Sequence, residues 1–70
     1  GAIAVQVDRA KGIALDLPVG VTRATVVYRT PDSSAGVYLD GVLRCDHCGG
    51  RELTFEITQP GHHTIGARLP

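Results

Sequence analysis

The stretch Leu53-Thr54-Phe55-Glu56-Ile57-Thr58 alternates apolar and polar side chains residue by residue. Successive side chains of a β-strand point to opposite faces, so a period of two is typical of a strand that is buried on one face. A helix would instead repeat its apolar residues every three or four positions. This stretch therefore predicts a strand with one face toward a core.

The same period recurs along most of the chain. Alternating apolar residues occur at Ile3, Val5 and Val7, at Ile13, Leu15, Leu17 and Val19, and at Ile65, Ala67 and Leu69. The segment 23–29 is rich in Thr, Val and Tyr, which fit a pleated sheet, and two shorter runs lie at 37–39 and 42–44. We expect a strand in each of these segments.

Turn-forming residues separate the predicted strands. Lys11-Gly12 precedes one strand, the segment 30–34 has a loop composition, and Asp40-Gly41 tolerates the positive φ of a tight hairpin turn. A Pro-Gly turn at Pro60-Gly61 precedes the last strand. If the last two strands pair directly, His63 falls on the core side of its strand.

These signals together predict an all-β fold. No stretch has a helical period, and about six or seven short strands are separated by turns about every 8 to 12 residues. We expect a small Ig-like β-sandwich, with a small open β-barrel as the alternative. A chain of 70 residues is long enough for one domain, so residues 1–70 are expected to form a single β-sandwich domain.

The second half of the chain, from Gly36 to Leu69, resembles two families of β-modules, the PEGA domains and the phage Ig-like domains. The residues that carry the resemblance are Val37-Tyr38-Leu39-Asp40-Gly41 and Pro60-Gly61-His62-His63-Thr64-Ile65. In these families a strand with an Asp-Gly turn precedes a Pro-Gly turn and a closing strand. The resemblance implies a surface module with an Ig-like fold.

The composition predicts a thin core. The chain has one Phe, two Tyr and neither Trp nor Met, so Val, Ile, Leu and Ala must supply most of the buried surface. Domains of this size usually need a metal, a disulfide or a partner subunit in addition to their core. We therefore expect either a protein partner or a homo-oligomer.

The charge pattern argues against two other classes of partner. Seven basic and seven acidic residues cancel and are scattered singly, which disfavours nucleic-acid binding. The apolar runs are too short for a membrane span. No basic segment followed by an apolar segment begins the chain, so no secretory signal is visible and the compartment stays open.

One segment calls for chemistry beyond packing. Cys45-Asp46-His47-Cys48-Gly49 resembles a single zinc knuckle, in which two thiolates two residues apart bind one tetrahedral ion. The rest of the ligand shell would come from His62 or His63, or from a second copy of the chain. Adjacent strand residues point to opposite faces, so the two histidines are not expected to bind one ion together.

Three interpretations of the cysteines remain open: bound zinc, a Cys45–Cys48 disulfide, and two free thiols. A disulfide is typical of small secreted β-domains, although so short a loop removes little chain entropy. Redox catalysis is disfavoured because no helix N-terminus is predicted to lower a thiol pKa. His62-His63 beside Pro-Gly is typical of a solvated turn, and His47 is expected to point outward.

The remaining residues disfavour an enzyme: no nucleophile elbow, paired carboxylates or phosphate-binding loop can be recognised. We expect a non-catalytic module that docks on a larger assembly, such as a capsid decoration or tail protein of a virion. One alternative is a zinc-dependent binding domain with Cys45, Cys48 and His62 or His63 as ligands. The other is a secreted surface- or carbohydrate-binding module, which the lack of Trp disfavours.

Overall fold

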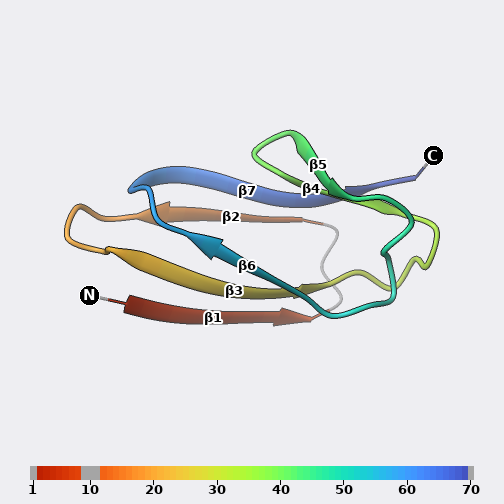
Figure 1. The fold of residues 1–70 in the computed structure, drawn as a ribbon, viewed down its shortest axis with the longest axis horizontal. Coiled ribbons are helices and arrows are strands. Elements are labelled where there is room, and N and C mark those ends of the chain that lie inside the picture. The colour runs from red at the N-terminus through yellow and green to blue at the C-terminus, as the bar shows by residue number, and fades with distance from the viewer. Residues whose placement is uncertain (1, 9–11, 70) are drawn as a thin grey trace.

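The computed structural model describes residues 2–8 and 12–69, and for residues 5–8 it describes the backbone alone. The described residues form seven strands and no helix (Figure 1). The strands are β1 (Ala2–Asp8), β2 (Gly12–Leu17), β3 (Arg23–Arg29), β4 (Gly36–Leu39), β5 (Val42–Cys45), β6 (Leu53–Ile57) and β7 (Gly61–Arg68). The predicted all-β class is confirmed. Among the described residues there is also no helix that could cross a membrane.

The strands form two sheets that lie one above the other (Figure 1). One sheet has three strands in the order β1-β3-β6, and the other has four in the order β2-β7-β4-β5. Strand β1 is parallel to β3, whereas the other paired strands are antiparallel. The described strands close no barrel, so the small β-sandwich is the architecture observed.

Alternation of inward and outward side chains builds the core between the sheets. In β3, Ala24, Val26 and Tyr28 are completely buried, while Arg23 and Arg29 at its ends are exposed. The other buried core residues are Leu17, Val37, Cys48, Phe55, Ile57 and Ile65. The period of two in the sequence therefore selects the inward residues of β2, β6 and β7 correctly.

Three predicted strand residues lie just outside the strands: Val19, Leu69 and Thr58, which directly follows the last residue of β6. Val19 was expected to continue the alternation of β2, but β2 ends at Leu17 and Val19 is 93% exposed. Pro18 cannot donate a ladder hydrogen bond, and its carbonyl accepts a turn hydrogen bond from Val21 N–H at 3.1 Å. Leu69 likewise follows the last residue of β7 and is 65% exposed.

The last two strands do not pair with each other. β6 lies in the three-stranded sheet and β7 in the four-stranded sheet, so the chain crosses between sheets at 58–60. Because β7 already begins at Gly61, His62 and His63 lie in a strand, and the expectation of a solvated turn is wrong. His63 nevertheless shares the core-side face with the buried Ile65, as predicted.

The predicted hairpin turn at Asp40-Gly41 is confirmed, since both residues have a positive φ, 52° and 79°. The predicted loop at 30–34 also lies between strands. Lys11 of the predicted Lys11-Gly12 turn lies outside the described residues, as do the side chains of Val5 and Val7.

Candidate functional site

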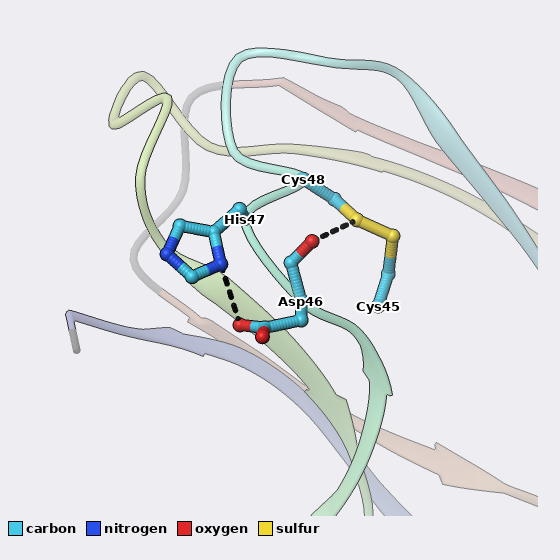
Figure 2. Close-up of a disulfide and its surroundings, with 4 residues drawn as sticks. All are labelled: Cys45, Asp46, His47 and Cys48. Carbon is cyan, nitrogen blue, oxygen red and sulfur yellow. Dashed lines mark hydrogen bonds and ion pairs between the residues drawn. A yellow bond between two sulfur atoms is a disulfide. The ribbon is translucent and has the colours of Figure 1, made fainter.

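The cysteine segment forms a closed loop at the end of β5 (Figure 2). Cys45 is the last residue of β5, Asp46 and His47 form the turn, and Cys48 returns to the core with 1% of its surface exposed. The two cysteines form a disulfide with a Cα–Cα separation of 5.7 Å. Of the three interpretations left open by the sequence, the structure contains the disulfide.

The disulfide loop is also bound to the β3–β4 loop by backbone hydrogen bonds. The N–H groups of Cys48 and Gly49 donate to the carbonyl of Ala35 at 3.0 and 3.1 Å. Gly50 N–H donates to the carbonyl of Thr30 at 2.7 Å. A Cβ at Gly49 would overlap the carbonyl oxygen of Asp32, so only glycine fits this contact. The Cys48-Gly49 end of the loop is therefore buried against the β3–β4 loop, while Asp46 and His47 stay exposed.

His47 lies away from the disulfide sulfur atoms. Its φ is 53°, which is uncommon for a residue other than glycine, and its side chain is 62% exposed. Its Nδ1 lies 2.9 Å from Asp46 Oδ1, on the side of the loop opposite the sulfurs (Figure 2). The expected outward orientation of His47 is confirmed. In this arrangement its imidazole stands beside a carboxylate and does not activate a sulfur.

His63 lies between two hydrogen-bond acceptors. Its Nδ1 is 2.7 Å from Asp40 Oδ2, and its Nε2 is 2.8 Å from the carbonyl oxygen of Gln59. Only a doubly protonated imidazolium can donate to both acceptors at once. The hydrogen bond to Asp40 accordingly raises the pKa of His63, and the bond to Gln59 adds to the effect.

Asp40 connects the β4–β5 turn to β7. Its Oδ1 accepts a hydrogen bond from Thr64 N–H at 2.8 Å, and its own N–H donates to the carbonyl of Thr64 at 2.7 Å. The hydrogen bond from His63 holds the pKa of Asp40 below its ordinary value, with smaller contributions from Thr64 and from the charge of His62. Asp40 is therefore more than the turn former that the sequence indicates.

The predicted zinc ligands lie in three separate places. His62 points to the outer face of β7, where its Nδ1 is 2.8 Å from Asp16 Oδ1, while His63 faces the core side. Cys45 pairs with Val37, which pairs with Ala67. Across the sheet, Cys45 is therefore level with Ala67. Ala67 lies four residues along β7 from His63, which is about 13 Å at the rise of a strand.

The distances between the predicted zinc ligands decide whether they can bind one metal ion. Within residues 2–8 and 12–69, no three His, Cys, Asp or Glu residues are placed to hold a metal ion. For the two cysteines and either histidine to bind one ion, as the zinc interpretation expects, the disulfide would have to be reduced and β7 would have to shift. The arrangement fits a structural staple in the loop and a charged hydrogen-bond cluster at Asp40.

Sequence reasoning missed two contacts between the β4 segment and β7. The guanidinium carbon of Arg68 lies 4.6 Å from the centre of the Tyr38 ring, and Asp40 pairs with His63. Both pairs join β4 to β7, which the sequence did not show to be neighbours. For the Asp40–His63 pair the sequence offered one indication, because His63 was expected on the core side of its strand.

Comparisons with protein families, curated proteins and solved structures found no match for this chain.

Proposed function

We propose that this domain is a non-catalytic module that docks on a larger protein assembly, with a capsid decoration or tail protein of a virion as the favoured setting. The observation that carries the proposal is a pair of adjacent exposed apolar residues on β5. Val42 is 62% exposed and Leu43 is 47% exposed, at the edge of the four-stranded sheet. Single exposed apolar residues are ordinary, but Val42 and Leu43 point to opposite faces of β5, so together they put apolar side chains on both sides of this edge, where a partner's side chains can pack.

The thin core supports the same proposal. The principal extents are 36 × 19 × 14 Å, and the largest fully buried side chains include only one aromatic residue, Tyr28. A sandwich this thin buries little apolar surface on its own. Docking on a partner would bury more, which is how small domains often gain stability.

The surroundings of Val42 and Leu43 indicate the chemistry of the partner. The neighbouring Arg44 is the one charged residue of β5, and its guanidinium carbon lies 5.6 Å from the centre of the Phe55 ring. The chain as a whole has a formal net charge of zero. The partner that fits best is therefore an apolar, weakly charged protein surface.

A photo-crosslinking amino acid placed at Val42 or Leu43 tests this proposal in the particles or cells that contain the protein. We expect one discrete crosslinked protein from either position. The matched control is the same amino acid at Thr54, an exposed residue on the outer face of the other sheet. Equal crosslinking from Thr54, or none from Val42 and Leu43, would contradict the proposal.

The disulfide favours a second candidate, a secreted surface module. Disulfides persist in oxidising compartments and are rare in the cytosol. Alkylation of thiols during isolation from the native source tests this candidate, because a disulfide leaves both cysteines unmodified. Alkylation of Cys45 and Cys48 would contradict this candidate and leave two free thiols or the zinc-dependent alternative, since only reduced thiolates bind the metal.

A further inference from the structure

Strand β2 is an edge strand without the usual protection. It ends the four-stranded sheet and, among the described strands, pairs only with β7. Natural edge strands are commonly shortened, bent by a bulge or marked with charged residues, because a free edge invites another strand. The six residues of β2 pair with β7 in one continuous register, contain no proline and carry one charge, Asp16.

The other edge of this sheet carries one charge as β2 does, and it is in addition shortened and bulged. β5 has four residues, carries Arg44, and shows a register shift against β4 between Val37 and Tyr38. A bulge bends the edge away from an incoming strand. The contrast identifies β2 as the edge better suited to pairing.

We propose that β2 pairs antiparallel with β2 of a second copy of this chain, about a two-fold axis at Ala14. This register places Gly12 opposite Asp16 of the second copy and Ile13 opposite Leu15. It keeps core-side residues opposite core-side residues, because the paired numbers are both odd or both even. The two four-stranded sheets then form one continuous sheet.

The side chains of β2 match this register. Ile13 and Leu15 are only half-buried, since they lie at the margin of the core. In the paired form, Ile13 of one copy would contact Leu15 of the other. Such cross-strand contacts stabilise antiparallel sheets. The outer face at the axis carries Ala14, which is exposed and small enough to lie opposite itself.

The charges of β2 also permit a second copy as the partner. Asp16 is the charged residue of the strand, and the proposed register separates the two copies of Asp16 by four residues, or about 14 Å. Each Asp16 keeps its own partner His62 at 2.8 Å. A zero formal net charge adds no overall repulsion between copies. This inference stands independently of docking through β5.

The test replaces Ala14 with a charged residue and measures self-association by sedimentation equilibrium over a concentration series. Because the axis places residue 14 opposite itself, Ala14→Lys sets two like charges side by side and should weaken the dimer about fivefold or more. Ala14→Glu should do the same, and an equimolar mixture of the two variants should form a heterodimer. Added salt should restore part of the association of each variant alone.

Thr54→Lys is the matched control, because Thr54 is an exposed outer-face residue of another edge strand, β6. It should leave the dimer unchanged, and circular dichroism should show that both lysine variants remain folded. A monomeric wild-type protein overturns the inference, as does a dimer that Ala14→Lys does not weaken. Neither result bears on the crosslinking test at Val42 and Leu43, so the two proposals fail separately.

Discussion

Strand β4 is held in different ways at its two ends. Where it begins, at Gly36, the disulfide loop packs against the β3–β4 loop through backbone hydrogen bonds and a contact that only Gly49 allows. Where it ends, at Leu39, the Asp40 carboxylate joins the turn to the imidazole of His63 and to the backbone N–H of Thr64. The first end depends on close packing and a covalent bond, whereas the second depends on protonation, so different conditions should loosen them.

The largest effect should come from Gly49→Ala. The added Cβ would overlap the carbonyl oxygen of Asp32, and backbone cannot move aside cheaply. We expect a loss of about 3 kcal/mol in the free energy of unfolding, measured by urea denaturation. Gly41→Ala is the control: nothing lies within 4 Å of its Cβ, and only its φ of 79° is unfavourable, at about 1 kcal/mol. Equal losses of stability in the two variants would show that the backbone at Asp32 can move to make room for the added Cβ.

Removing the disulfide should have the next largest effect. The loop that it closes is short, with a sequence separation of 3, so the chain-entropy model gives a loss of about 2 kcal/mol. The double variant Cys45→Ala/Cys48→Ala, compared with wild type by urea denaturation, measures it. Reductant should lower the stability of wild type and leave the double variant unchanged. If reductant does not change the stability of the wild type, the backbone hydrogen bonds are sufficient to hold the loop without the disulfide.

The smallest effect should be at the other end of β4, and it should depend on pH. The pKa of His63 is raised, so its stabilising contribution is complete below the ordinary histidine pKa and is lost as the pH rises through the raised value. The pKa of Asp40 is lowered, so its contribution is present above the ordinary value and is lost as the pH falls through the lowered one.

Asp40→Asn separates these contributions, because asparagine tolerates the positive φ of the turn but carries no charge. We expect a loss of about 1 kcal/mol near pH 6 and a lower His63 pKa, measured by urea denaturation and by NMR titration. The control is Asp16→Asn beside His62, where both side chains are more than half exposed. It should change stability by less than about 0.5 kcal/mol. Equal losses from the two variants would contradict the role of the Asp40 cluster.

Much of the fold could be predicted from the sequence because the alternation of apolar and polar residues is a property of neighbouring positions in the chain. It placed β3 at the observed bounds, ended β6 one residue late at Thr58, and selected the inward residues of β6, Phe55 and Ile57. It failed at Val19, where Pro18 ends the ladder although the apolar spacing continues. Periodicity describes which side chains could face a core, and it does not show where pairing stops.

Neighbouring strands were harder to predict because pairing is a long-range property. The parallel alignment of β1 with β3 and the separation of β6 from β7 leave no mark on local composition. The candidate site shows the same limit. Cys45 and Cys48 lie close in sequence, so their disulfide could be anticipated, whereas the contact between Asp40 and His63 depends on β4 and β7 being neighbours.

The position of β7 affects when the protein can fold during synthesis. β7 lies between β2 and β4 in the four-stranded sheet, although it is the last described strand along the chain. Until translation has passed Arg68, β2 has no partner in its sheet and β4 has only β5. Such distant contacts form slowly, so the nascent chain should stay incomplete on the ribosome and reach its final structure only after β7 has emerged.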